Sequence, residues 1–484
     1  MPTVSFPLAL RQNALRNPDA VALVCGDREL TWTQLDQRSN RLARDYSARG
    51  VGHGDFVTIA LANGPAFVLA SFAAWKLGAV PQPISWRLPE QERSAILAQG
   101  KPALVVADEV GASGGRPWAP ARPSQGDEVS DAALPDAVSP ARQALASGGS
   151  TGRPKLIVDA LPAECDPSLP FYGNEPGSTV LVPGPLYHAA GFVNTTVTLL
   201  GGGRVILMDY FDAELALEFI ERHRVEWVSF VPTMLQRIWR LPEAVRERSD
   251  LSSLRRVVSS GGPCPAWLLR AWIEWLGPER VFEVYGGTER IGGTLISGGE
   301  WLAHPGSVGR PTGGRKIRIL DVDGRDLPAG ELGEVYMMPP GGPGSTYRYM
   351  GASARTTPDG WESLGDLGYL DADGYLYLVD RRTDMIVSGG ANVYPAEIEG
   401  ALAAHPAVQA SAVIGLPDED LGQRVHAIVE ARPGVDDDVL RAHLEGQLAR
   451  YKIPRSFEYV EGPLRDESGK LSRTALRAAR LPKS

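Results

Sequence analysis

The feature that most restricts the fold of this 484-residue chain is a regular alternation of short apolar runs with helix-like segments. This alternation is typical of parallel sheets that are covered by helices. The strand-like runs lie at 56–63, 103–108, 204–209, 225–231 and 255–262, and the helix-like segments lie at 65–77, from 212 onward and up to 276. We therefore expect an α/β fold with mostly parallel sheets.

The pattern changes in the last third of the chain. Asp-Gly pairs stand between strand-like runs at 315–327 and 366–380, and they predict hairpins of a β-rich subdomain because Asp-Gly suits tight turns. A polar segment follows, and then a helix, two strands and a helix are expected at 395–404, 408–414, 425–431 and 436–449. This order predicts a second, smaller domain. The stretch 111–140, rich in Gly, Pro, Ser and Asp, is expected to be a surface connection.

Composition excludes several classes of protein. The longest apolar stretch, 66–75, is interrupted by Lys76 and predicts no membrane span, and the amino terminus lacks a cationic secretory start, so we expect a cytoplasmic protein. The net charge of −9 gives no electrostatic reason to bind nucleic acid. Cys25, Cys165 and Cys264 are far apart, which disfavours both a disulfide framework and a zinc site. A small-molecule enzyme fits better.

A glycine- and hydroxyl-rich segment that ends in a lysine is the strongest chemical motif. Its glycines let the backbone approach an anion, its hydroxyls can donate hydrogen bonds, and the lysine supplies a full charge, as a polyphosphate site requires. The segment consists of Ser147, Gly148, Gly149, Ser150, Thr151, Gly152, Arg153, Pro154 and Lys155. It is not a Walker A loop, because Arg153 and Pro154 precede the lysine, and this counts against a P-loop ATPase. The alternative is a solvated linker.

Two further motifs carry groups that suit a nucleotide. The first consists of Tyr285, Gly286, Gly287, Thr288 and Glu289. In it a carboxylate beside a hydroxyl can hold a magnesium ion that bridges phosphate oxygens, and the tyrosine can stack on a purine. In the second, Asp366 can accept hydrogen bonds from two ribose hydroxyls, reinforced by Arg381. Each motif alone also fits an ordinary surface turn.

Lys470 and His188 are weaker candidates when they are taken alone. Lys470 follows Ser468 and Gly469, which form a flexible turn near the carboxyl terminus, and an isolated lysine is ordinarily solvated. His188 follows a strand-like run closely enough to line a pocket, although a satisfied core or surface histidine is the alternative.

Together, in this order, these motifs resemble the superfamily of acyl-CoA synthetases, adenylation domains and luciferases over essentially the whole chain. The segment 380–399 is similar to the family's hinge and the start of its mobile small domain. The resemblance implies a large N-terminal domain, 1–382, of two sheets with flanking helices plus a β-rich subdomain. It also implies a small mobile α+β domain at 383–484. The hinge would be Thr383, where relatives commonly have Asp or Lys.

The resemblance also implies roles in a first half-reaction that forms an acyl-adenylate from ATP. The glycine-rich segment would wrap the β- and γ-phosphates, Thr288 would touch the α-phosphate, and Glu289 would bind magnesium. Tyr285 would face the adenine, and Asp366 with Arg381 would hold the ribose. Lys470 would bridge the substrate carboxylate and the α-phosphate, where a cation offsets developing negative charge. Gly261 and Gly262 are further candidates at the nucleotide.

In the second half-reaction the family's small domain rotates, so that Lys470 withdraws and Gly389 and Gly390 move beside the pantetheine tunnel of CoA. The expected product is an acyl-CoA. The candidate acyl pocket consists of His188, Phe192, Val231, Gly287 and Gly292. Its glycines suggest room for a bulky, terpenoid or steroidal acid. With Gly149 and Leu156, the phosphate segment resembles that of the branch that includes bile-acid and polycyclic-acid CoA ligases.

Two alternatives to an acyl-CoA ligase stay open. An adenylation enzyme that loads a carrier protein would share every motif, and a nucleotide-binding module could keep the fold without turnover. The expected partners are a small carboxylic acid, ATP and CoA, with a carrier protein as the alternative acceptor, but neither nucleic acid nor a membrane. The protein is expected to be a homodimer or a monomer.

Overall fold

The computed structural model describes residues 2–122, 129–148, 154–465, 469 and 471–481. Its largest element is a nine-stranded sheet with the order β17-β16-β15-β14-β13-β11-β12-β2-β3. The strands are β2 (Val21–Cys25), β3 (Arg28–Thr31), β11 (Thr179–Val182), β12 (Arg204–Leu207), β13 (Trp227–Phe230), β14 (Arg256–Ser259), β15 (Val281–Gly286), β16 (Gly293–Ser297) and β17 (Arg310–Pro311). The strands from β15 to β2 run parallel, whereas β3, β16 and β17 are antiparallel at the edges.

A second sheet is parallel throughout, with the order β5-β4-β6-β7. Its strands are β4 (Phe56–Ala60), β5 (Val80–Pro83), β6 (Leu104–Ala107) and β7 (Trp118–Ala119). Because β7 pairs with β6, the expectation that 111–140 is only a connection is wrong at these two residues. A short 3-10 helix, η1 (Val110–Ser113), also lies in this stretch.

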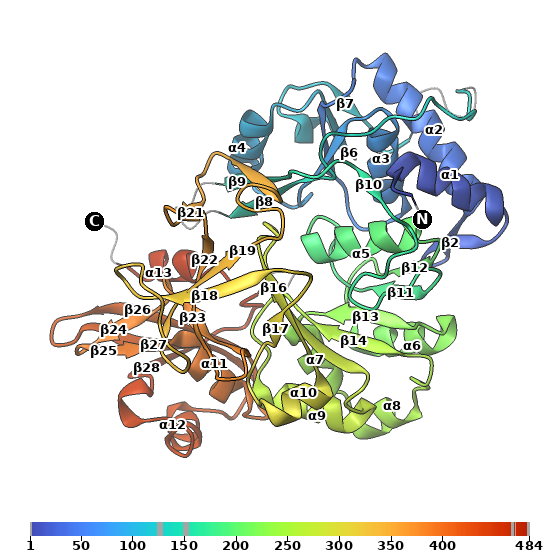
Figure 1. The fold of residues 1–484 in the computed structure, drawn as a ribbon. Coiled ribbons are helices and arrows are strands. Elements are labelled where there is room, and N and C mark those ends of the chain that lie inside the picture. Colours follow the sequence, from blue (N-terminus) through green and yellow to red (C-terminus); the bar gives the residue numbers. More distant parts are fainter. Residues whose placement is uncertain (1, 123–128, 149–153, 466–468, 470, 482–484) are drawn as a thin grey trace.

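Helices cover both faces of the nine-stranded sheet (Figure 1). One core contains residues of α1 (Phe6–Arg16), α2 (Trp32–Ala48), α3 (Pro65–Lys76) and α5 (Ala189–Leu200). The other contains residues of α6 (Ala213–His223), α7 (Pro232–Trp239), α9 (Ala266–Leu276) and α10 (Gly298–Ala303). Two further helices are α4 (Glu90–Gly100), which packs against the second sheet, and the surface helix α8 (Glu243–Arg248). Asp212 caps α6 by accepting a hydrogen bond from the Leu215 backbone, as the predicted helix start requires.

The β-rich subdomain consists of two small sheets. One has the order β20-β9-β8, with β8 (Ala144–Gly148), β9 (Pro154–Asp159) and β20 (Tyr347–Met350). The other contains β18 (Lys316–Leu320), β19 (Gly333–Met338), β21 (Arg355–Thr356), β22 (Glu362–Leu370) and β23 (Leu376–Arg381). The hairpin predicted at 366–380 is present as β22 and β23, with Gly374 at φ +80°. The turn predicted at 315–327 is present, closed by the antiparallel bridge between Leu320 and Asp326, but its second arm is short and the long partner of β18 is β19. The pair β1 (Val4–Ser5) and β10 (Glu164–Cys165) ties the amino terminus down.

The small C-terminal unit is α+β. Its elements are β24 (Ile386–Ser388), β25 (Ala391–Val393), α11 (Pro395–Ala403), β26 (Val408–Asp418), β27 (Gly422–Ala431), α12 (Asp437–Glu445), the 3-10 helix η3 (Arg450–Lys452), β28 (Ser456–Tyr459) and α13 (Arg473–Ala478). It has a hydrophobic core of its own and lies below the β-rich subdomain in Figure 1. The predicted α/β fold with a large and a small domain is confirmed. The boundary at 382/383 stays a prediction. No helix in the described ranges is long and apolar enough to cross a membrane.

Candidate active site

The two ends of the predicted phosphate segment lie on the paired strands β8 and β9. Ser147 lies opposite Lys155, and Gly148 lies opposite Pro154. Antiparallel pairing therefore holds the two ends of the segment together. The predicted residues Gly149, Ser150, Thr151 and Gly152 lie outside the described residues.

Lys155, Glu289 and Tyr349 form a polar cluster beside this hairpin. The Lys155 Nζ lies 3.2 Å from the Glu289 Oε1 and 2.7 Å from the Tyr349 hydroxyl. The same hydroxyl donates to the Glu289 Oε1 at 2.6 Å. Glu289 is only 7% exposed, so its charge is balanced by the lysine rather than by water. Burial and the nearby carboxylate raise the pKa of Tyr349, which keeps its hydroxyl a donor.

Tyr349 was not among the predicted site residues. It reaches the cluster because β20 pairs with β9, with Tyr349 opposite Ile157. Thr346, just before this strand, donates its hydroxyl to the Glu289 backbone carbonyl at 2.9 Å. No local motif marks these two residues, because the pairing joins segments that are far apart in sequence.

Asp366 joins Tyr285 and Arg381 in a second cluster. The Tyr285 hydroxyl donates to one carboxylate oxygen at 2.6 Å, and the Arg381 Nε donates to the other at 3.3 Å. Asp366 and Arg381 are direct partners in the β22–β23 register, which explains their separation in sequence. Burial and the negative charge of Asp366 raise the pKa of Tyr285. Each carboxylate oxygen keeps a lone pair that can accept a hydroxyl from a ligand.

The site lies at the carboxyl ends of three neighbouring parallel strands, β13, β14 and β15. Open α/β sheets bind ligands at this edge. Val231 follows β13, and a Cβ placed on Gly261 would lie 3.2 Å from its Cγ1. A Cβ on Gly262 would lie 3.9 Å from the Pro232 Cδ, at ordinary contact distance. The turn from Gly286 to Glu289, with the half-buried Thr288, follows β15.

Gly287 and Gly292 do not leave the open space that the sequence suggested. A Cβ on Gly287 would lie 2.6 Å from the Leu364 Cδ1, and one on Gly292 would lie 2.7 Å from the Met337 Cβ. Both distances are shorter than carbon atoms can approach, so neighbouring side chains already occupy the volume. The reading of these glycines as room for a bulky acid is therefore wrong.

His188 and Phe192 lie at the start of α5. His188 occupies the N-cap position, half-buried beside the Tyr187 ring. Phe192 is 2% exposed, and its ring lies 5.7 Å from that of Trp75. Phe192 is therefore a residue of the core beneath the site.

The small domain places Gly469 at this edge of the sheet. Lys470 itself lies outside the described residues, but a Cβ on Gly469 would lie 2.7 Å from the Thr233 Oγ1 and 3.1 Å from the Val231 Cγ2. Gly469 has φ +77°, a second reason for glycine here. A cavity of about 270 Å³ beside it lies between the domains, and its lining includes Arg237, Arg240, Arg432 and Arg465. Such a charged lining does not suit an apolar acyl tail.

The predicted CoA-tunnel glycines lie elsewhere in this orientation of the domains. Gly389 and Gly390 form the exposed turn between β24 and β25, at the outer edge of the small domain (Figure 1). Thr383 is exposed in the turn after β23. The structure therefore brings Gly469, not the glycine hairpin, against Val231.

Glu283 is a buried carboxyl that the sequence analysis missed. It lies on β15 opposite Ser259 of β14 and is 6% exposed. Burial raises its pKa to about 8, and a hydrogen bond from the Cys264 backbone acts in the opposite direction. Among the described residues no cation pairs with it, so the neutral acid is the stable form at this site.

The fold and these clusters define the class: an α/β large domain with two polar clusters at the carboxyl edge of its sheet, and a small domain whose Gly469 lies against Val231 at that edge. The family model described as "AMP-binding enzyme" matches residues 10–348, and "AMP-binding enzyme C-terminal domain" matches residues 397–470. The chain belongs to the AMP-binding enzyme family. It is an AMP-forming acid–thiol ligase of the acyl-CoA synthetase type.

Three similar proteins illustrate the range of the family. A feruloyl-CoA synthase from Amycolatopsis sp is 36% identical, over 96% of this chain and 97% of its own. A fatty acid–[acyl-carrier-protein] ligase from Streptomyces coeruleorubidus is 33% identical, over 96% and 94%. The solved o-succinylbenzoate CoA synthetase from Bacillus subtilis, in complex with its acyl-adenylate intermediate, has a TM-score of 0.82 and 28% identity, with all of both chains covered. It has also been solved with ATP and a magnesium ion.

Proposed function

We propose that this chain activates an aromatic carboxylic acid with ATP and transfers the acyl group to CoA. The observation that carries the proposal is the meeting of four parts at one sheet edge. These are the Lys155–Glu289 pair, the Tyr285–Asp366–Arg381 cluster, the turn after β15 and the Gly469 segment. Each part is matched with one portion of the reactants.

The proposed roles follow from charge and position. Lys155 and the hairpin tip would hold the β- and γ-phosphates, and Asp366 would accept the ribose hydroxyls, with Tyr285 beside the adenine. Lys470 would lie between the substrate carboxylate and the α-phosphate. There it offsets the repulsion of two anions in a geometry that the two domains build together.

A magnesium ion fits the residues that are present. Magnesium is usually held by one or two carboxylates together with substrate phosphates, and Glu289 offers one buried carboxylate beside a threonine. Held by Glu289, the ion would neutralise part of the negative charge of the phosphates. Lys155, which now pairs with Glu289, would be released towards the phosphates.

The reaction would proceed in two balanced steps. A carboxylate oxygen attacks the α-phosphorus, the bond to the bridging oxygen breaks, and pyrophosphate leaves. The thiol of CoA, having lost its proton to the solvent, then attacks the acyl carbonyl, and AMP leaves with the bridging oxygen. In the second step Gly389 and Gly390 would line the entrance for pantetheine, after the small domain rotates about Thr383.

Two observations favour an aromatic acid over a bulky polycyclic one. The relatives from Amycolatopsis sp and Bacillus subtilis are named for feruloyl and o-succinylbenzoate groups. In addition, Leu364 and Met337 fill the space that Gly287 and Gly292 would otherwise leave. His188 and Val231 remain the proposed pocket walls.

A hydroxamate-trapping screen tests this proposal, because hydroxylamine captures any acyl-adenylate whatever the natural acceptor is. The enzyme, ATP and magnesium would be mixed in parallel with a hydroxycinnamic acid, a linear fatty acid and a steroidal acid. We expect trapping with the hydroxycinnamic acid at the highest kcat/KM. Preferential trapping of the steroidal or the linear acid would contradict the aromatic assignment.

A carrier protein is the second candidate acceptor, because the Streptomyces coeruleorubidus relative is named as an acyl-carrier-protein ligase. The enzyme, ATP and the best acid from the screen would be supplied with free CoA or with a carrier protein bearing pantetheine. Mass spectrometry would detect each thioester. We expect the CoA thioester to form. Acylation of the carrier protein alone would show that the acyl acceptor is a carrier protein rather than CoA.

A further inference from the structure

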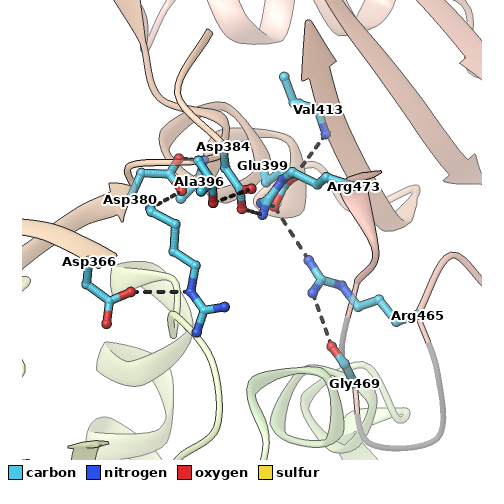
Figure 2. Close-up of polar contacts among 11 residues, drawn as sticks. Asp366, Asp380, Asp384, Ala396, Glu399, Val413, Arg465, Gly469 and Arg473 are labelled. Carbon is cyan, nitrogen blue, oxygen red and sulfur yellow. Dashed lines mark hydrogen bonds and ion pairs between the residues drawn. The ribbon is translucent and has the colours of Figure 1, made fainter. Parts of the chain in front are cut away.

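A single buried carboxylate, Glu399, ties together several segments of the small domain (Figure 2). It lies on α11 and is 8% exposed. Its Oε1 accepts the Val413 backbone N–H at 2.8 Å. Arg473 donates to both carboxylate oxygens, with Nη2 at 2.7 Å from Oε2 and Nε at 3.3 Å from Oε1. Fork-shaped pairs of this kind are strong and directional.

Glu399 also binds a second arginine on the other side of Lys470 in sequence. The Arg465 Nη2 lies 3.6 Å from the Glu399 Oε2. Its Nη1 donates to the Gly469 carbonyl at 3.2 Å. That carbonyl belongs to the peptide group that joins Gly469 to Lys470. One carboxylate therefore anchors both ends of the segment that carries Lys470, and one anchor also holds the adjoining peptide (Figure 2).

The same network reaches the predicted hinge. The Arg473 Nη1 lies 2.7 Å from the Asp384 Oδ2, next to Thr383. One residue before Arg381, Asp380 accepts the backbone N–H of Ala396, at the start of α11, at 2.9 Å. Arg473 thus connects the segment of Lys470 to the chain on which the small domain would turn.

We propose that Glu399, Arg465 and Arg473 are positioning residues that hold Lys470 in place for adenylate formation. This inference rests on the proposed function of Lys470. A displacement of about 1 Å in a catalytic group can cost about 10²-fold in rate, so a cation on a turn needs such anchors. All three residues belong to the predicted small domain and move away with Lys470 when that domain rotates. They therefore act on the first half-reaction and not on the second.

The test compares the two half-reactions in Glu399→Gln and Arg473→Lys. The first variant removes the charge at nearly constant shape, and the second keeps the charge but loses the fork. We expect pyrophosphate release to fall about 10- to 100-fold in kcat, with the KM for ATP changed less than about twofold. Thioester formation from a synthetic acyl-adenylate and CoA should stay at the wild-type rate.

Glu458→Gln is the matched control. Glu458 receives a similar fork from Arg480, with both contacts at 2.6 Å, in the same small domain. This control should change neither half-reaction, although it removes the ionic part of a more exposed arginine pair and of a contact with His426. If pyrophosphate release fell equally in the control, Glu399 would only stabilise the small domain, and the proposal would be overturned.

A double-mutant cycle with Lys470→Ala separates positioning from mere structure. If Glu399 acts through Lys470, adding Glu399→Gln to Lys470→Ala should cause no further loss of pyrophosphate release. Additive losses, equal losses in both half-reactions, or wild-type rates in the Glu399 and Arg473 variants would overturn the proposal. Should Glu399→Gln not fold, the charge-conserving Arg473→Lys provides the same cycle. If Lys470→Ala itself keeps full activity, the proposed role of Lys470 fails instead.

Discussion

At the scale of the residue, Asp366 is prepared for its proposed ligand before that ligand arrives. Tyr285 and Arg381 each hold one of its oxygens, so the carboxylate is fixed in orientation. In Asp366→Asn the negative charge is lost. The amide NH2 group also cannot accept the hydrogen bond that one carboxylate oxygen accepts from Tyr285 or would accept from the ribose. A hydrogen bond to a charged group is worth about 1.5–3 kcal/mol, so we expect the KM for ATP to rise about 10- to 100-fold.

Steady-state kinetics with varied ATP would measure this rise. Asp373→Asn, at the exposed tip of the same hairpin, is the control and should leave the KM unchanged. An Asp366→Asn enzyme with an unchanged KM for ATP would remove Asp366 from the nucleotide site.

Glu283 predicts a pH dependence of stability. Its native pKa of about 8 exceeds the ordinary 4.5, so the native carboxyl stays protonated where the unfolded one ionises. The contribution of Glu283 to the free energy of unfolding is complete below about pH 4.5. It falls by about 1.4 kcal/mol per pH unit as the pH rises from there to about 8. Glu283→Gln should flatten this part of the curve. Urea denaturation of both proteins from pH 5 to 8 would check it, and parallel curves would refute it.

Sequence reasoning found residues whose chemistry is local and missed those that depend on distant pairing. Lys155, Glu289 and Asp366 stand in motifs, and the structure brings each into a polar cluster. Tyr349 enters one of these clusters only because β20 pairs with β9. Glu283 is polar in a strand, and nothing in the strand's own pattern says which face is covered.

At the scale of the element, the glycines after β15 show why residue size alone does not reveal a pocket. Gly292 lies against Met337 of β19, a strand that joins this region from elsewhere in the chain. We expect Gly292→Ala to destabilise the protein by about 1–3 kcal/mol, because the methyl group would overlap packed side-chain atoms. Thermal unfolding would measure the loss.

Gly299→Ala in α10 is the matched control, since a Cβ there meets nothing within 4 Å. Alanine in place of glycine within a helix should leave the Tm unchanged or raise it slightly. If both substitutions were equally tolerated, the space at Gly292 would be open after all.

The hairpins show the same division between local and distant information. Asp-Gly located the turn between β22 and β23 correctly, because turn chemistry is local. At 315–327 the same dipeptide also marks a turn, bridged by Leu320 and Asp326, but β18 forms its long pairing with the distant strand β19. The parallel strands were easier to locate, because their apolar runs are buried on both faces.

At the scale of the whole molecule, the small domain is held in one orientation by contacts from α7. The Arg240 Nη2 donates to the carbonyls of Ala403 and His405, at 3.1 and 3.4 Å, where the carboxyl end of α11 favours a cation. Loss of this contact in Arg240→Ala should lower pyrophosphate release about 3- to 10-fold and spare thioester formation from acyl-adenylate.

Arg248→Ala is the comparison, because Arg248 pairs with Glu214 on the surface of the large domain. Both half-reactions would be followed in the two variants. Equal slowing of both half-reactions in Arg240→Ala would show that this orientation of the domains is not specific to adenylate formation.

The central claim, that the carboxylate attacks the α-phosphorus of ATP, is tested most directly by an isotope-transfer measurement. The best acid from the hydroxamate screen would be labelled with oxygen-18 in its carboxylate and turned over with ATP and CoA, and the nucleotide product would be analysed by mass spectrometry. The account predicts AMP that carries one oxygen-18 atom, because AMP leaves with the bridging oxygen of the acyl-adenylate. Unlabelled AMP, or ADP together with labelled inorganic phosphate, would contradict it.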